Sequence, residues 1–215
     1  MVIAILASQG QRDEMLNRNI QAEIVWVDSL RVLSAVEADA YLDLQFQMDP
    51  ERIERLNRLL PAPLIVNAVA IPGRDLPSGF TRMNGWNTML KRSVAELAPG
   101  KEANREKLKQ VFELLDYKPC FLPDFPGMVS PRIIAGIVNE AYFTLEAGVS
   151  SKEEIDIAMK LGTNYPEGPF KWSEQIGLEN FYELLKQLAR HDDRYNICDL
   201  LIEELNASKD KNGFT

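Results

Sequence analysis

The sequence has few of the residues on which metal and thiol chemistry depend. Its 215 residues include one histidine, His191, and two cysteines, Cys120 and Cys198, which share no motif. One imidazole and two isolated thiols match no transition-metal site, and lone thiols of this kind are most often small buried apolar groups. Neither a G-x-S-x-G nor a P-loop sequence occurs. We therefore expect no metal, and we assign the cysteines no function.

Long apolar runs are missing as well. Runs such as residues 2–7 and 133–138 are much shorter than the roughly 20 residues that cross a bilayer. The N-terminus also lacks the basic and apolar regions of a signal peptide. We expect a cytoplasmic protein without a membrane partner. The net charge of -8 repels a phosphate backbone, so we expect no nucleic-acid partner.

The first half alternates short apolar runs with helical patterns, which is typical of a parallel sheet built from β-α units. The strands expected from these runs are residues 2–7, 23–27, 40–46, 63–70, 80–86 and 118–122. The expected helices are residues 12–19, a helix opened by Asp49 and Pro50, and residues 101–115. The sequence thus predicts an α/β domain over residues 1–123.

From Pro126 onward the apolar period changes from two to 3.6, and no strand pattern returns. Ser151 and Glu154 form the pattern of a capping box, while Gly148 and Gly162 stand where two helices should end. We expect an all-α domain over residues 124–208, followed by a flexible tail over residues 209–215.

A dense series of motif residues runs in order and without a gap through residues 124–178. The series consists of Asp124, Pro126-Gly127, Arg132, Asn139-Glu140-Ala141, Glu146-Ala147-Gly148-Val149, Ile155-Asp156, Ala158-Met159-Lys160-Leu161-Gly162, Tyr165-Pro166, Gly168-Pro169-Phe170 and Ile176-Gly177-Leu178. This part of the chain resembles the C-terminal helical domain of the 3-hydroxyacyl-CoA dehydrogenase family.

The resemblance implies a fold, a cofactor and partners. It implies a Rossmann-like parallel sheet, shorter than is usual in the family, followed by the all-α domain. It further implies NAD as cofactor, an acyl-CoA-like small molecule as ligand, and a homodimer formed through the helical domain.

Dinucleotide binding needs a glycine-rich turn after the first strand, so that the pyrophosphate can approach the backbone. Only Gly10 of the three glycines remains in this turn, and Asp13 takes the place of the last one. We expect Asp13 to bring bulk to the helix-strand contact and negative charge toward the phosphates, which Arg12 would partly offset. Asp28, at the end of the second strand, stands where an acidic residue would hold the ribose, although it also suits a simple cap.

Oxidation of a 3-hydroxyl needs a general base that titrates near neutrality, for which histidine is the natural choice. The resemblance aligns Asn84 with the family's catalytic histidine and Glu96 with the glutamate that orients it. An amide cannot accept the proton of a hydroxyl. Glu96 is therefore the retained catalytic candidate, although its surroundings in AELAPG also suit a surface or helix-start carboxylate.

Two further polar positions of the family differ. The resemblance aligns Val69 with the serine that contacts the substrate and Pro131 with an asparagine of the active site. Asn67 and Asn87 match family positions, and with Asn84 they form the candidate substrate cleft. Asparagine is also a common turn former at strand ends.

Three functional interpretations remain open. The first is an active oxidoreductase whose base is Glu96 or a water molecule. The second is a noncatalytic relative that keeps the fold, the dimer and a ligand cleft. The third is a structural or partner-binding dimer.

Overall fold

The computed structural model describes residues 1–212, and these divide into two compact units. Unit 1 comprises residues 1–128 and unit 2 comprises the residues from 129 onward.

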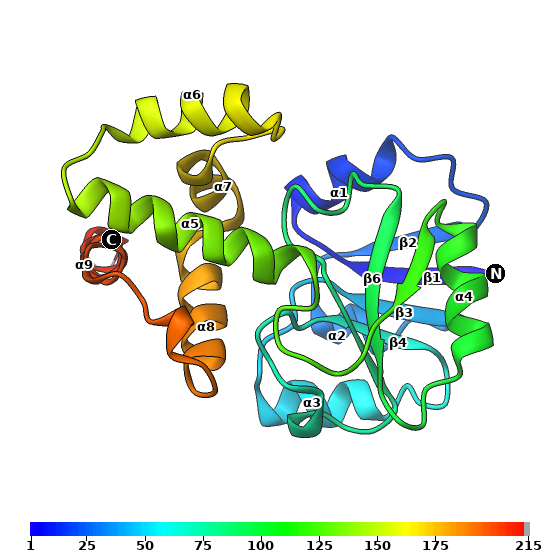
Figure 1. The fold of residues 1–215 in the computed structure, drawn as a ribbon. Coiled ribbons are helices and arrows are strands. Elements are labelled where there is room, and N and C mark those ends of the chain that lie inside the picture. The colour runs from blue at the N-terminus through cyan, green and yellow to red at the C-terminus, as the bar shows by residue number, and fades with distance from the viewer. Residues whose placement is uncertain (213–215) are drawn as a thin grey trace. The chain divides into compact units, whose positions relative to one another are not determined.

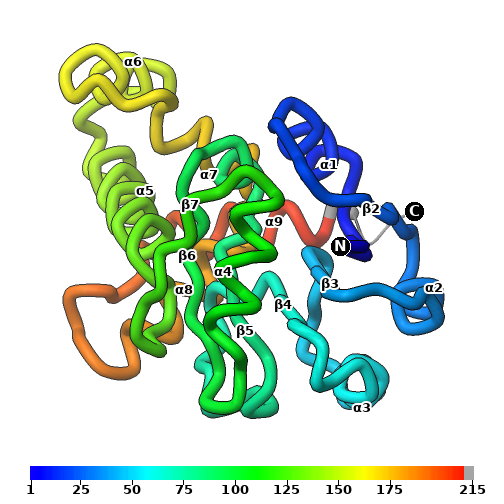
Figure 2. The backbone as a smooth tube through the Cα atoms, turned by 90° about the vertical axis from the view of Figure 1, so that its right-hand side faces the viewer, coloured from blue at the N-terminus to red at the C-terminus, as the bar shows by residue number. Residues whose placement is uncertain are grey.

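Unit 1 is built on a seven-stranded sheet (Figure 1). The strands are β1 Val2–Leu6, β2 Glu23–Val27, β3 Ala40–Asp43, β4 Leu64–Asn67, β5 Phe80–Met83, β6 Val94–Pro99 and β7 Lys118–Phe121. Their spatial order is β2-β1-β3-β4-β5-β6-β7 (Figure 2). All neighbouring strands are parallel except β5 and β6, which are antiparallel. Together with helices on both faces, this is the Rossmann-like sheet that the resemblance implies.

Helices cover both faces of this sheet. They are α1 Gln9–Leu16, α2 Leu30–Leu33, α3 Pro50–Asn57 and α4 Arg105–Leu114, with a short 3-10 turn, η1, at Gly73–Asp75. Met15 of α1 and Phe112 of α4 belong to one apolar core, whereas Leu33 of α2 and Leu56 of α3 belong to the other. Successive side chains of a strand point to opposite faces of the sheet, so strands such as β1 contribute apolar side chains to both cores.

The expected start of α3 is confirmed. The Asp49 side chain accepts the backbone N–H of Arg52 at 2.8 Å, and Pro50 occupies the first turn. The helix expected at residues 101–115 begins later, at Arg105, because Asn104 caps it.

Strand β6 corrects the sequence interpretation. Residues 94–99 form a buried strand between β5 and β7, so Glu96 lies on a strand instead of at the surface or at a helix start. Alanine, glutamate and leucine favour helices, but pairing with two neighbouring strands overrides that weak local preference.

The described residues of unit 2 form helices joined by turns and loops, with no strand among them. Its helices are α5 Ser130–Glu146, α6 Lys152–Thr163, α7 Pro169–Ile176, α8 Leu178–Ala189 and α9 Asp199–Asn212, with a 3-10 turn, η2, at Asp193–Tyr195. The capping box of Ser151 and Glu154 is confirmed, and Gly148 takes the expected left-handed conformation at φ +67°.

Two expectations about helix ends in unit 2 need correction. Helix α6 passes Gly162 and ends at Thr163, after which Asn164 supplies the left-handed conformation at φ +56°. Asparagine tolerates this conformation better than most residues. Of the tail expected at residues 209–215, residues 209–212 continue α9, and residues 213–215 lie outside the described residues.

Several motif residues of unit 2 have structural roles. The Asp156 carboxylate accepts the backbone N–H groups of Phe170 at 2.8 Å and Lys171 at 3.0 Å, at the start of α7. A Cβ added to Gly168 would lie 2.3 Å from that carboxyl group, so only glycine fits there. Asn139 donates to the Asn196 carbonyl at 2.8 Å and accepts from the Cys198 N–H at 3.0 Å. Helix packing therefore accounts for these parts of the motif.

Candidate functional site

The candidate site of unit 1 lies where the parallel strands end. Carboxyl ends of parallel strands meet at one edge of a sheet, which is where such folds bind ligands. Helix α1 begins at this edge directly after β1. The Ser8 hydroxyl accepts the Gln11 N–H at 3.3 Å, while the Gln11 side-chain oxygen accepts the Ser8 N–H at 2.9 Å. These reciprocal bonds form a capping box, which satisfies two backbone donors.

Gln11 is the most connected side chain at this edge, and it is 3% exposed. Its Nε2 donates to the Leu44 carbonyl at 3.2 Å and to the Gly85 carbonyl at 2.8 Å. Its Oε1 also accepts from Nε2 of Gln45 at 2.6 Å. One amide thus joins the starts of three loops, those that follow β1, β3 and β5.

Asn67 joins two of the same loops from the end of β4. Its Nδ2 donates to the Leu44 carbonyl at 3.2 Å, and its Oδ1 accepts the Gly85 N–H at 3.0 Å. A Cβ at Gly85 would lie 3.0 Å from Cβ and Cγ of Asn67. The predicted cleft residue Asn67 therefore packs against the backbone of Gly85.

The residues of the turn after β1 correct one expectation. Asp13 is exposed and accepts a hydrogen bond from Gln9 at 2.7 Å, so it adds no bulk to the helix-strand contact. Positions i and i+4 share a helix face, and it is Gln11 and Met15 that face inward. Gly10 is exposed, and a Cβ added there would meet nothing within 4 Å.

Asp28 and Arg12 meet beyond the end of β2. Nη2 of Arg12 donates to Asp28 Oδ1 at 2.5 Å and to the Val27 carbonyl at 2.7 Å. Nε of Arg12 donates to the Ala7 carbonyl at 3.3 Å, and the guanidinium lies 5.6 Å from the Trp26 ring centroid. Arg12 therefore pairs with Asp28 instead of offsetting the charge of Asp13.

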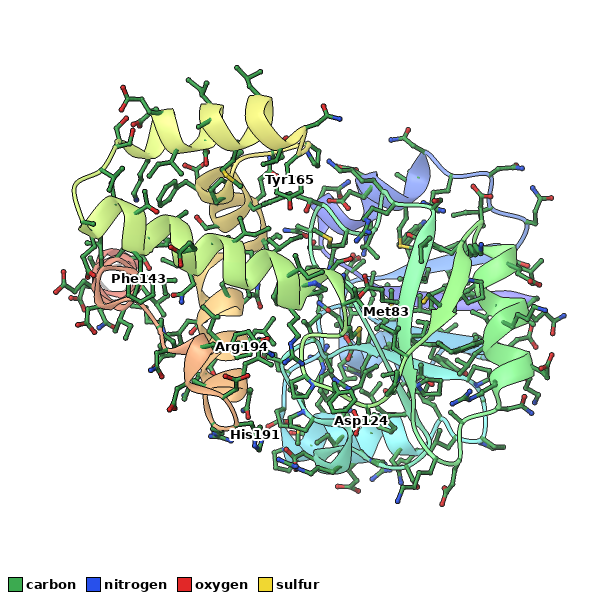
Figure 3. All side chains as sticks on the ribbon, viewed as in Figure 1. Met83, Asp124, Phe143, Tyr165, His191 and Arg194 are labelled. Carbon is green, nitrogen blue, oxygen red and sulfur yellow. The ribbon has the colours of Figure 1, made fainter. Side chains whose placement is uncertain are left out.

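Asn84 and Glu96 are brought together by the pairing of β5 with β6. The Asn84 N–H donates to the Glu96 carbonyl at 3.1 Å, directly after Met83 (Figure 3). Asn84 is 6% exposed, and its Oδ1 accepts the Trp86 N–H at 3.4 Å. Glu96 is 7% exposed, and Arg92 lies 3.8 Å from its carboxylate. The residues aligned with the family's catalytic pair are thus neighbours in the structure.

The other predicted positions are spread over both units. Val69 is 2% exposed, and its carbonyl accepts the Gly127 N–H at 2.8 Å. Asn87 lies in the loop after Trp86 and is partly buried. Pro131 is buried in the first turn of α5, in unit 2, where proline suits the missing donor.

Asp124 makes a contact that the motif alone does not reveal. It pairs with Arg82 of β5, whose side chain is 1% exposed, and it accepts the Gly73 N–H at 2.9 Å (Figure 3). Arg82 also donates to the carbonyls of Ala68, Ile71 and Phe125. Burial lowers the pKa of the Arg82 guanidinium, and the Asp124 carboxylate acts in the opposite direction.

The remaining candidates lie outside this edge. His191 is exposed in the loop after α8 in unit 2 (Figure 3). Within residues 1–212, no group of three or more His, Cys, Asp or Glu side chains is placed to hold a metal ion. None of the helices in that range has the length and apolar character needed to span a membrane.

Sequence reasoning missed Gln11, Gln45 and Arg82. Gln11 had a recognisable signal, since Ser8 and Gln11 have the spacing of a capping box. The contacts of Gln45 and Arg82 join segments far apart in sequence, and no local pattern marks them.

Comparisons with known proteins agree with the resemblance. The model of the 3-hydroxyacyl-CoA dehydrogenase C-terminal domain matches residues 127–213. A 3-hydroxyadipyl-CoA dehydrogenase from Escherichia coli (strain K12) is 45% identical over 82 residues, which cover 37% of this chain and 17% of that relative. A 3-hydroxybutyryl-CoA dehydrogenase from Bradyrhizobium diazoefficiens is 32% identical over 138 residues, which cover 62% of this chain and 47% of that relative. The matched segments thus span less than half the length of both relatives.

A solved structure extends the likeness to the whole fold. The crystal structure of (S)-3-hydroxybutyryl-CoA dehydrogenase from Ralstonia eutropha matches with a TM-score of 0.73 at 19% identity. The match covers 96% of this chain and 94% of that one, so both units share its fold.

Proposed function

We propose that this chain, which is similar to the 3-hydroxyacyl-CoA dehydrogenase family, is a noncatalytic or strongly impaired homologue that retains the fold. The observation that carries this proposal is the amide of Asn84. It occupies the position aligned with the catalytic histidine, opposite Glu96 on the next strand. Its oxygen already accepts the Trp86 N–H, and an amide cannot take a proton from a hydroxyl.

Two other substitutions support the proposal. Val69 offers no hydroxyl at the position aligned with the substrate-binding serine, and its carbonyl is bonded to Gly127. Pro131 offers neither an amide side chain nor a backbone donor. Losing a positioned base alone costs roughly 10²- to 10⁴-fold in rate.

The direct test is reduction of acetoacetyl-CoA by NADH, followed by absorbance and compared with an active family member. We expect turnover at least about 10²-fold below that of the active member. Turnover at a comparable rate would contradict the proposal.

The alternative, an active enzyme with a remodelled base, is favoured by one observation: Glu96 is buried beside Asn84. Glu96→Gln distinguishes the alternatives if turnover is found. Loss of turnover in this variant, with an unchanged melting temperature, would support Glu96 as the base, whereas retained turnover would exclude it.

We also propose a homodimer formed through unit 2, with an acyl-CoA-like small molecule as the ligand class. An apolar groove of about 540 Å³ between α5 and α6 supports the dimer, and Ile133 and Val149 line it although both are mostly exposed. Val149→Glu should produce a monomer in sedimentation equilibrium. Leu16→Glu, which alters an exposed leucine of unit 1, is the matched control and should leave the dimer intact. A monomeric wild type at micromolar concentration would exclude the dimer.

For the ligand, acetyl-CoA is a suitable probe in calorimetry. Saturable binding would support a retained cleft. Its absence would favour a purely structural or partner-binding dimer.

A further inference from the structure

The edge formed by the ends of β1, β2 and β3 is where a dinucleotide binds in sheets of this type. In that mode the pyrophosphate approaches the first helix N-terminus, and an acidic residue after the second strand holds the ribose hydroxyls. We infer that the side chains of Gln11 and Arg12 form hydrogen bonds with the polar groups at this edge, and that the chain therefore does not bind NAD. This inference concerns cofactor binding and stands independently of the lost base.

Arg12 occupies the groups at the ends of β1 and β2. Its guanidinium donates to two strand-end carbonyls, those of Ala7 and Val27, and to the Asp28 carboxylate. The bond between the guanidinium and the carboxylate is charge-assisted, which makes it shorter and stronger than a bond between two neutral groups. Oδ1 of Asp28, the residue that the sequence assigns to ribose binding, therefore already carries a charged donor, while the Asp28 side chain itself is 88% exposed.

Gln11 occupies the groups at the ends of β3 and β5. An amide side chain has two N–H donors and an oxygen with two lone pairs. The Gln11 side chain uses all of these groups. Its Nε2 donates to the carbonyls of Leu44 and Gly85, and its Oε1 accepts from Ser8 and Gln45. Because Gln11 is buried, displacing it would leave strand-end carbonyls without partners, which is costly.

The turn itself also differs from a phosphate-binding turn. The N–H groups of Ser8 and Gln11 are bonded within the capping box. Gly10 remains compatible with close backbone approach, but the side chains of Gln11 and Arg12, which follow it, donate to strand-end carbonyls of the sheet edge. These residues do not fit a bound dinucleotide.

The first test uses wild-type protein labelled with ¹⁵N and titrated with NAD⁺ and NADH. We expect the amide signals of residues 8–13 and 28 to stay in place. Saturable shifts of these signals with a Kd below about 1 mM would overturn the inference. Because the readout is binding, dinucleotide binding without turnover would overturn this inference alone and leave the proposed loss of catalysis standing.

The second test asks whether Gln11 holds the edge together. Gln11→Ala should lower the Tm by about 5 °C, because it removes buried hydrogen bonds. Gln9→Ala is the matched control: Gln9 is exposed, its side chain donates to exposed Asp13, and its replacement should change the Tm by less than about 1 °C. Equal melting temperatures for the two variants would overturn the role of Gln11. The NAD titration needs no variant and decides the inference even if Gln11→Ala does not fold.

Discussion

Different kinds of interaction stabilise the interior of unit 1 and the interior of unit 2. At the carboxyl edge of unit 1, buried polar side chains such as Gln11 and Asn67 cross-link loops from distant parts of the chain. Unit 2 relies on apolar helix packing, with polar groups such as Asp156 and Glu154 placed mainly at helix ends. The family motif survives where it serves helix packing. At the strand ends of unit 1, Asn84 and Val69 differ from the residues with which the resemblance aligns them.

The largest effect should come from the apolar core of unit 2. Leu184 of α8 is fully buried, so Leu184→Ala should destabilise the protein by about 3 kcal/mol through lost burial and a cavity. Leu161→Ala is the control, because Leu161 is 83% exposed. Urea unfolding measures both variants. Similar midpoints for the two would refute the view that unit 2 depends on this core.

The next largest effect should come from the ion pair of unit 1. Asp124→Ala leaves the buried Arg82 guanidinium without its carboxylate, which should cost about 2 kcal/mol because Asp124 is itself partly exposed. Asp75→Ala removes an exposed carboxylate 3.8 Å from Arg74 and should have little effect. If Asp124→Ala unfolds at the same urea concentration as the wild type, the ion pair between Arg82 and Asp124 does not stabilise unit 1.

A glycine pair tests how tightly the sheet edge is packed. Gly85→Ala forces a methyl group to within 3.0 Å of Asn67 and should destabilise by about 1 to 2 kcal/mol. Gly10→Ala has open space around it and lies in a helix, so it should be neutral or slightly stabilising. Thermal unfolding distinguishes the two, and a harmless Gly85→Ala would mean that the edge is loosely packed.

The smallest effect should come from the helix cap of unit 2. The Ser150 hydroxyl, followed by the Ser151 backbone and side chain, lowers the pKa of Glu154 from its ordinary value of 4.5. A carboxyl group whose pKa is lowered by folding stabilises the protein above its ordinary pKa. That contribution is lost as the pH falls through the folded-state pKa.

The Glu154→Gln variant should therefore be slightly less stable than wild type at neutral pH, and the difference should shrink below roughly pH 4. Melting curves across this range measure it. A difference that grows on acidification would contradict the assigned sign.

Local patterns predicted much of the fold. Apolar runs located β1 and β4, and the Asp49-Pro50 pair located the start of α3. Strand β6 escaped prediction because its residues prefer helices in isolation, and only pairing with β5 and β7 makes it a strand.

The candidate site was only partly predictable. Alignment with the family motif identified Asn84 and Glu96, and the structure places them on adjacent strands. The spacing of a capping box marks Gln11, but its bond to the Gly85 carbonyl, 74 residues away in sequence, has no local signal, and neither has the pairing of Arg12 with Asp28. The position of each residue around the axis of α1 determines that the Gln11 side chain faces the sheet and the Asp13 side chain faces solvent.

The sequence by itself determined the resemblance to the family, the two-part fold class and the absence of a histidine at the aligned catalytic position. These follow from residue identities and from local periodicity, which need no knowledge of distant contacts. Only the tertiary structure decided that Arg82 pairs with Asp124 and that Gln11 and Arg12 fill the edge expected to hold a dinucleotide. A hydrogen bond depends on where two distant groups meet, and packing the sheet is what brings those groups together.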